Sequence, residues 1–294
     1  MVVVRPGPLT TVQDLGRRGV AHLGVPRAGA LDEPALRAAN RLVGNAPGAA
    51  ALETTLGGIA VRALRPLTVA VTGAPSPVRV DGRPAAWGAP VAVPAGAVLD
   101  VGAATSGVRA YLAVAGGVAV EPVLGSRSAD LLSGLGPAPL AVGDELPVGP
   151  RPPFGPLPEL VPLPAPPALL ALRLRLGPRA DWFTPDVADR LSHATFRVAP
   201  ASNRIALRTE GPPLARAREG ELPSEGMVLG AVQVPPDGLP VVFLADHPTT
   251  GGYPVVGVVP PADLAAAAQA RPGTPLRFAV LPGRPASVPT GPRQ

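Results

Sequence analysis

The sequence predicts a folded, mostly β protein with two strand-rich halves, and three observations support this prediction. Short runs of Val, Leu and Ala alternate with Gly, Pro and Asp turn signals along most of the 294 residues. Hydrophobic residues make up 46% of the chain, which provides enough apolar surface to offset the entropy of ordering despite 35 glycines and 43 prolines. Ten prolines fall between residues 147 and 167 and divide the chain almost in half.

The first half is expected to contain short antiparallel strands and one helix. Its strand candidates are the β-branched or alternating runs 2–5, 59–64, 67–72, 78–80, 91–93 and 108–114. The segments Asp81-Gly82 and Pro94-Ala95-Gly96 supply turns between them. The helix is expected to begin after Asp32, whose side chain can accept a hydrogen bond from the first turn, and to end at Gly44-Asn45.

The second half has the same kind of content. Its strand candidates are 169–176, 196–200, 205–209, 231–234, 241–245 and 276–280. Short helices are expected after Thr184-Pro185 and from Asp263 to Arg271-Pro272-Gly273. This similarity suggests two related barrel domains. The expected division is an N-terminal domain of residues 1–148, a semi-rigid proline-rich linker of residues 149–167, a C-terminal domain of residues 168–284, and a flexible tail of residues 285–294.

Residue usage excludes several kinds of chemistry. There is no cysteine, so disulfides, thiolate nucleophiles and cysteine-ligated metals are excluded. There is also no lysine, because all 26 basic residues are arginine, and this excludes a Schiff base, a P-loop lysine and a lysine that carries biotin. The three histidines, His22, His193 and His247, lack metal-binding spacing, so we expect no metal site.

Net charge and hydropathy limit the expected partners. A net charge of +5 and a pI near 11.0 could favour nucleic acid, but the arginines are dispersed and only 3% of residues are aromatic. We therefore expect no nucleic-acid partner. The start of the chain lacks a signal-peptide pattern and no apolar run is long enough to span a bilayer, so we expect a cytoplasmic protein without membrane contact.

The strongest local signal follows the apolar run 241–245. It reads Asp246-His247-Pro248-Thr249-Thr250-Gly251-Gly252-Tyr253-Pro254. Hydroxyls and glycines at a strand end can direct side-chain and backbone donors at an anion or an oxyanion. A glycine-rich turn with a packed tyrosine is the alternative interpretation.

Three further segments contain polar residues that could serve a site. Arg127, between Ser126 and Ser128, could bind a carboxylate or phosphate, or could be an exposed turn residue. Glu225 could be a general base, could hold an arginine, or could be a surface residue. The remaining candidates are Ser202-Asn203-Arg204 and the segment 10–19. No glycine spacing typical of a nucleotide-binding loop is present, so an ATP site would have to be unconventional or shared with another chain.

Taken in order, several segments resemble the family that contains the C subunit of 5-oxoprolinase, also called KipA, allophanate hydrolase subunit 2 or the biotin-dependent carboxyltransferase family. The segments are 6–16, 22–26, 29–32, 39–45, 53–58, 110–117, Gly125-Ser126-Arg127-Ser128, Ser202-Asn203-Arg204, Ser224-Glu225-Gly226, 233–238 and Thr249-Thr250-Gly251-Gly252-Tyr253-Pro254. The resemblance extends from about Val2 to Phe278. Each segment is weak evidence alone, but the ordered set is specific.

The resemblance implies two cyclophilin-like β-barrel domains and one component of an enzyme that hydrolyses 5-oxoproline to L-glutamate with ATP. It implies a KipI-like protein and a LamB/YcsF-like protein as the other two components, and an isolated chain that is inactive. It leaves open whether ATP contacts this chain. One alternative is the carboxyltransferase component of a biotin-dependent amide carboxylase of the urea type, with biotin on a separate carrier. Another is a non-catalytic regulator that binds a KipI-like protein.

On this hypothesis we expect donors for phosphate and oxyanion oxygens from Arg127, Arg204 and the amides around Gly251-Gly252. Glu225 or Asp246 is expected to act as a base or to orient the substrate. The residues expected to bind substrate are Ser126, Ser128, Asn203, Arg204, Thr249, Thr250, Gly251, Gly252 and Tyr253. Two segments depart from the family pattern, His247-Pro248 in place of Arg-Gln and Ile205-Ala206-Leu207 after Arg204, and they leave the substrate identity open.

Overall fold

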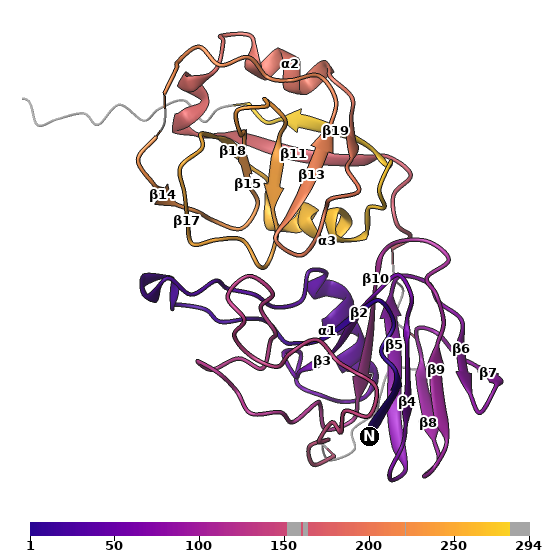
Figure 1. Ribbon diagram of the computed structural model, residues 1–294. Coiled ribbons are helices and arrows are strands. Elements are labelled where there is room, and N and C mark those ends of the chain that lie inside the picture. The colour runs from indigo at the N-terminus through magenta and orange to yellow at the C-terminus, as the bar shows by residue number, and fades with distance from the viewer. Residues whose placement is uncertain (152–159, 161–163, 221, 283–294) are drawn as a thin grey trace, which may run out of the picture.

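The structure is a computed structural model that describes residues 1–151, 160, 164–220 and 222–282 (Figure 1). Within these residues it is mainly β, as predicted, with three α-helices: α1 (Glu33–Leu42), α2 (Val187–His193) and α3 (Pro261–Gln269). The predicted tail of residues 285–294 and most of the predicted linker lie outside the described residues. No helix in the described part of the chain is long and apolar enough to cross a membrane.

Ten antiparallel strands of the first half form two five-stranded sheets, with orders β1-β4-β9-β6-β7 and β2-β3-β10-β5-β8. The strands are β1 (Val2–Arg5), β2 (Leu9–Gln13), β3 (Ala51–Thr55), β4 (Ile59–Arg62), β5 (Leu67–Gly73), β6 (Val78–Val80), β7 (Arg83–Ala85), β8 (Pro90–Val93), β9 (Val98–Val101) and β10 (Arg109–Val114). A barrel was expected here, but the hydrogen bonds divide the strands into two sheets. The chain changes sheet between β1 and β2, where Pro6 and Pro8 lack amide donors.

The hydrophobic core of the first half contains residues of both sheets, such as Val61 and Leu99 from one and Leu52 and Leu112 from the other. Helix α1 packs against β5 and β10. Its first turn is capped as predicted, because the Ala35 amide donates to the Asp32 carboxylate at 3.0 Å.

The second half is a closed barrel of seven strands, in the order β11-β18-β15-β16-β13-β12-β19. The strands of this half are β11 (Leu170–Leu176), β12 (Phe196–Val198), β13 (Ala206–Glu210), β14 (Glu225–Gly226), β15 (Ala231–Gln233), β16 (Val241–Phe243), β17 (Thr250–Gly251), β18 (Val255–Val258) and β19 (Pro275–Val280). Phe196 and Phe278 pack edge to face in its core, with ring centroids 5.7 Å apart. Strands β14 and β17 form a separate two-stranded ribbon.

The two halves are in direct contact at the C-terminal end of α3. The amides of Val108 and Arg109 donate to the Gln269 side-chain oxygen at 2.9 and 3.0 Å. Arg109 also donates to the carbonyl of Ala268. These bonds dock α3 of the second half on β10 of the first.

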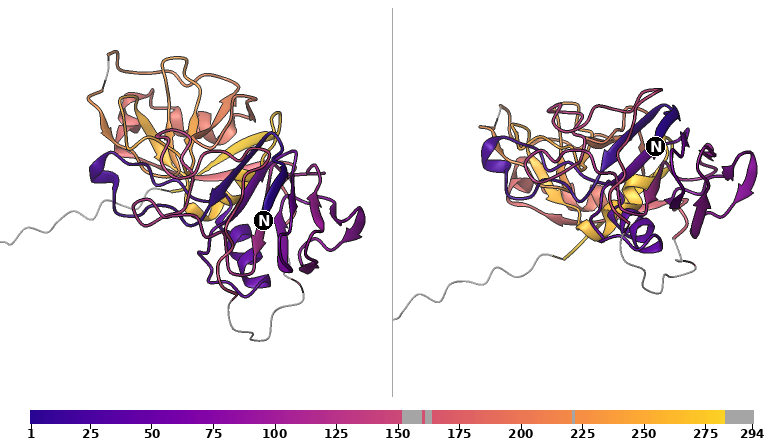
Figure 2. Two further views of the ribbon diagram at one scale, coloured as in Figure 1. Left: turned by 60° about the horizontal axis from the view of Figure 1, so that its bottom comes forward. Right: turned by 90° about the horizontal axis from the view of Figure 1, so that it is seen from below.

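A segment that we call the arm, residues 14–32, connects β2 with α1 and includes the 3₁₀ turn η1 (Ala21–Leu23). In Figures 1 and 2 the indigo arm extends beside the barrel of the second half. At the base of the arm, the backbone around Gly16 and the backbone around Gly29 lie against each other. A Cβ on either glycine would come within 2.8 Å of backbone atoms of the other segment, and both residues have positive φ. The arm therefore leaves the first half through a tight, fixed backbone crossing.

Candidate functional site

Arg204, in the loop before β13, is fully buried where the two halves meet. Its Nε and Nη2 atoms donate to the two oxygens of Asp246, each at 2.9 Å. Its Nη1 donates to Glu53, and its Nη2 also donates to the Gly29 carbonyl at 2.6 Å. All three nitrogens are thus engaged by protein groups, and Arg204 links the second half to two segments of the first.

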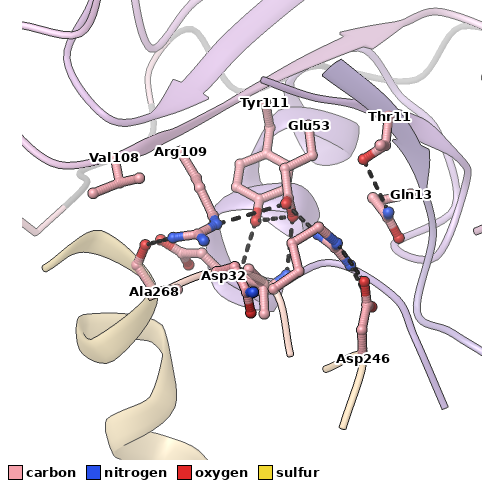
Figure 3. Close-up of polar contacts among 12 residues, drawn as sticks. Thr11, Gln13, Asp32, Glu53, Val108, Arg109, Tyr111, Asp246 and Ala268 are labelled. Atoms are coloured by element: carbon pink, nitrogen blue, oxygen red, sulfur yellow. Dashed lines mark hydrogen bonds and ion pairs between the residues drawn. The ribbon is translucent and has the colours of Figure 1, made fainter. Parts of the chain in front are cut away.

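Glu53, on β3, is the centre of the same buried network (Figure 3). It accepts hydrogen bonds from the Tyr111 hydroxyl at 2.7 Å and the Leu31 amide at 3.0 Å, and its Oε1 lies 3.7 Å from the Nε of Arg109. Burial opposes its ionisation, but the charges of Arg204 and Arg109 outweigh burial and lower the pKa of Glu53. Glu53 is therefore a structural carboxylate held ionised by two buried guanidinium groups.

The predicted loop around Arg127 is organised by Asp14, at the base of the arm. The hydroxyls of Ser126 and Ser128 and the amide of Arg127 each donate to the Asp14 carboxylate at 2.6 Å. The Nε of Arg127 donates to the Val120 carbonyl at 2.6 Å. The two serines are buried, so they hold this loop to the arm and do not present their hydroxyls to solvent.

A pocket of about 780 Å³ lies between the arm, α1 and the barrel. Its walls combine apolar side chains of the second half, such as Leu244 after β16 and Leu264 of α3, with four arginines from the arm and α1. These are Arg17, Arg18, Arg27 and Arg37. Among the described residues that line the pocket, Glu33 is the one acid, so the pocket is electropositive.

His247, next to Asp246, lines the barrel side of this pocket. Its Nδ1 lies 2.7 Å from the Pro248 carbonyl, and its ring stacks on Phe243 with centroids 5.9 Å apart. A carbonyl can only accept, so in the neutral ring Nδ1 carries the hydrogen and Nε2 has the lone pair. Within the part of the chain that the structure describes, Nε2 has no hydrogen-bond partner.

The environment of His247 favours its neutral form. Burial is the largest cause and lowers its pKa, and the charge of Arg27 acts in the same direction. The Pro248 carbonyl and the charges of Asp246 and Asp130 oppose this shift without cancelling it. The imidazole is thus available as a proton acceptor near neutral pH.

This shift predicts a pH dependence of stability. At pH values between the lowered pKa of His247 in the folded chain and its ordinary value of 6.5, the unfolded chain binds more protons at this residue than the folded chain does. The folded protein therefore becomes less stable as the pH falls through that range. Urea unfolding of the wild type and of His247→Gln at a series of pH values should give a difference curve that falls below pH 6.5. A flat difference curve would contradict the assignment of His247 as a buried neutral group.

Apart from Ser126, Arg127 and Ser128 in the loop bound to Asp14, the structure distributes the residues expected from the sequence over three places. Thr249 lines the pocket, whereas Asp246 and Arg204 belong to the buried network beside it. Asn203 accepts hydrogen bonds from the amides of Ile205 at 2.8 Å and Ala206 at 3.2 Å, and so shapes the turn before β13.

The third place is the β14–β17 ribbon. Glu225 pairs there with Gly251 across the two strands, and Gly226 pairs with Thr250. Its carboxylate accepts from Arg179 of the 3₁₀ turn η2 (Pro178–Trp182), and this hydrogen bond lowers the pKa of Glu225. Gly252 follows the ribbon, and the Tyr253 side chain is exposed. Glu225, Gly251 and Gly252 are not among the residues that line the pocket.

Sequence reasoning did not identify Arg27, Arg37 and Glu33 as site residues. Arg17 and Arg18 lay within the candidate segment 10–19, and His247 lay within the candidate segment 246–254 but was given no role there. Only the arginine pair and the segment 246–254 signalled this pocket locally, because the arm and α1 approach the barrel only in the folded chain. Within the described residues, no group of three or more acidic or histidine side chains is placed to hold a metal ion.

Residues 23–280 match the family model described as the carboxyltransferase domain, subdomains A and B. The chain is 38% identical to the C subunit of 5-oxoprolinase from Escherichia coli (strain K12) over 281 residues, which cover 94% of this chain and 89% of that protein. It is 34% identical to the C subunit of 5-oxoprolinase from Haemophilus influenzae, covering 91% of this chain and 87% of the relative. It is 33% identical to urea amidolyase of Saccharomyces cerevisiae, of which it covers only 16%.

Two solved structures share the fold along almost the whole chain. A crystal structure of TTHA0988 superposes with a TM-score of 0.86 at 40% identity, and covers 95% of this chain but only 55% of that one. The urea amidolyase of K. lactis superposes with a TM-score of 0.85 at 31% identity, and this chain spans 18% of its length. The chain therefore belongs to the carboxyltransferase domain family, and it is a homologue of the C subunit of 5-oxoprolinase.

Proposed function

We propose that this chain is the C subunit of an ATP-dependent 5-oxoprolinase and acts together with a KipI-like protein and a LamB/YcsF-like protein, the other two components of the enzyme. The observation that carries the proposal is the nearly end-to-end match to two proteins that are C subunits of 5-oxoprolinase, of which the chain covers 89% and 87%. The urea amidolyase of S. cerevisiae contains a similar segment, but this chain accounts for only 16% of it.

The pocket supports this proposal through its size and chemistry. A small five-membered lactam that carries a negative charge needs an apolar wall for the ring and positive charge for the anion. The pocket provides both, with Leu31, Leu244 and Leu264 beside the four arginines. Thr249, predicted from the sequence to bind substrate, lies on the same surface.

The chemistry proposed for this chain centres on His247. A lactam carbonyl is a poor electrophile, and ATP bound to the complex would supply the phosphoryl group that activates it. A water molecule that attacks the activated carbon must lose a proton, and the Nε2 of His247 is a neutral acceptor at the pocket surface. The proton then passes from His247 to the lactam nitrogen as the carbon–nitrogen bond breaks, which leaves an acyl phosphate. A second water molecule hydrolyses the acyl phosphate to the carboxylate of glutamate and inorganic phosphate. We propose no nucleotide site made by this chain alone.

A second candidate function is carboxyl transfer to an amide such as urea. The fold match to the K. lactis urea amidolyase, with a TM-score of 0.85, favours it. Because this chain has no lysine, carboxybiotin would have to arrive on a separate carrier. A neutral substrate such as urea would make no use of the pocket's excess of positive charge.

Reconstitution of the complex tests the proposed function. The chain, purified alone, is expected to be inactive, whereas the mixture with the KipI-like and LamB/YcsF-like proteins should produce glutamate and ADP only when 5-oxoproline is present. Parallel reactions with urea and a carboxybiotin donor test the second candidate. Absence of 5-oxoproline turnover in the complete mixture, with the three proteins shown to associate, would reject the proposal and favour a regulatory binding role.

A further inference from the structure

We infer that Arg27 binds a carboxylate of the pocket's ligand, and that it does so on the side of the pocket opposite His247. The identity of the natural ligand rests on the proposed function, whereas the existence of the carboxylate site does not. It assigns a substrate class: a small amide or lactam with a carboxylate, in preference to a neutral amide.

Arg27 lines the pocket with part of its guanidinium unused by the described residues. Its Nη2 atom donates to the Glu33 carboxylate, while Nε and Nη1 have no hydrogen-bond partner within the described chain. Its side chain is 22% exposed and lines the pocket, so these donors are accessible to a ligand. Glu33 engages only Nη2, so the guanidinium keeps donors for charge-assisted hydrogen bonds to a ligand carboxylate.

The arginines around Glu33 carry more positive charge than Glu33 can balance. Glu33 is shared by three arginines, because Arg37 donates to it at 3.3 Å and Arg18 lies 3.9 Å away. One carboxylate cannot neutralise three guanidinium groups, so the cluster of Arg18, Arg27, Arg37 and Glu33 has a net charge of +2. An anionic ligand would balance this excess.

Arg17 adds positive charge at the wall of the pocket. Its side chain is buried, and its Nε donates to the Val123 carbonyl at 3.0 Å while Nη2 donates to the Ser128 carbonyl. These bonds use one edge of the guanidinium, and the buried Nη1 is left without an acceptor among the described residues. A buried cation with an unused donor is costly unless an anion approaches it.

Nearby carboxylates do not supply that acceptor. Asp14 is bound by the serine loop, Asp130 accepts from Leu132 and Ser133, and Asp246 accepts from Arg204. Burial lowers the pKa of Arg17 despite the opposing charges of these three acids. These three acids offset part of the charge of Arg17, so the excess positive charge of the pocket comes mainly from the cluster of Arg18, Arg27, Arg37 and Glu33.

The positions of Arg27 and His247 would together orient the ligand. Arg27 and His247 both line the pocket and are close enough for the charge of Arg27 to lower the pKa of His247. A ligand carboxylate on Arg27 would place the attached ring toward the neutral Nε2 of His247. Recognition and proton transfer would then use opposite ends of one small molecule.

The test compares two probes of equal shape, cyclopentanecarboxylate and cyclopentanecarboxamide, by ligand-observed NMR titration of the full chain. The wild type is expected to bind the carboxylate at least about 10-fold more tightly, as a charge-assisted hydrogen bond implies. Arg27→Gln should abolish this preference, whereas Arg41→Gln, an exposed arginine of α1 outside the pocket, should keep it. Far-UV circular dichroism verifies the fold of each variant.

Activity in the reconstituted complex separates the two proposals. Arg27→Gln should raise the KM for 5-oxoproline by about 10- to 100-fold with little change in kcat, because it removes binding that is equal in ground and transition states. No preference of the wild type for the carboxylate probe, or an unchanged preference in Arg27→Gln, would overturn the carboxylate site even if 5-oxoproline is turned over. A third outcome is that Arg27→Gln loses the preference for the carboxylate probe, but the complete wild-type complex does not turn over 5-oxoproline. This outcome would support the carboxylate site and reject the proposed function.

Discussion

Replacement of Glu53 by leucine is expected to lower the free energy of unfolding by about 3–5 kcal/mol, the usual cost of removing one partner from a buried ion pair. The substitution would leave Arg204 and Arg109 buried without the carboxylate that faces both of them. It would also remove the acceptor of the Tyr111 hydroxyl and of the Leu31 amide. Urea denaturation at neutral pH measures the loss.

The same substitution is expected to uncouple the two halves. The chain has two tryptophans, Trp87 in the first half and Trp182 in the second, so variants with a single tryptophan report on each half separately. Both reporters should show one midpoint when Glu53 is present, and two midpoints when it is leucine. The network would then be shown to join the halves into one cooperative unit.

A matched control removes an exposed carboxylate from the first half. Asp100 pairs with Arg5 at 2.5 Å, but both side chains are 45% exposed, so Asp100→Leu should cost less than about 1 kcal/mol. A loss of similar size in Asp100→Leu and Glu53→Leu would show that burial of the network adds nothing. That result would also remove the argument that Arg204 serves to join the halves.

Much of the secondary structure could be predicted from local pattern. The run 78–80 is a strand with the predicted bounds, and the helix that follows Asp32 begins and ends near the predicted residues. Strand β2, which pairs with the β3 strand that carries Glu53, was not predicted. Its residues Thr10, Thr11 and Gln13 are buried together with Val12, so no alternation of apolar and polar residues marks it.

The site was harder to predict because its parts come from distant segments. Arg204 was predicted as a donor for substrate, and the structure shows that its nitrogens instead bind Asp246, Glu53 and the Gly29 carbonyl. Sequence spacing cannot indicate such a pairing across 151 residues. Ser126 and Ser128 were predicted to bind substrate, and in the structure their hydroxyls donate to Asp14 while the Ser128 carbonyl accepts from Arg17.

His247 is the residue whose replacement should affect turnover most. We expect His247→Gln to reduce kcat for 5-oxoproline in the reconstituted complex by about 10²–10⁴-fold, the usual contribution of a general acid or base. Glutamine keeps a similar volume and a polar end, so the pocket shape and the binding of substrate through Arg27 should be retained. The KM should therefore change much less than kcat.

The pH profile distinguishes a proton acceptor from a residue that only shapes the pocket. In the wild type, kcat/KM should fall on the acid side as His247 is protonated, with a midpoint below its ordinary pKa of 6.5 because burial and Arg27 lower it. His247→Gln should lack this acid limb. The matched control is His193→Gln, at the end of α2, because that ring also faces a backbone carbonyl, of Asp189, but lies outside the pocket. Its kcat and acid limb should equal those of the wild type, and an acid limb that persists in His247→Gln would mean that another group accepts the proton.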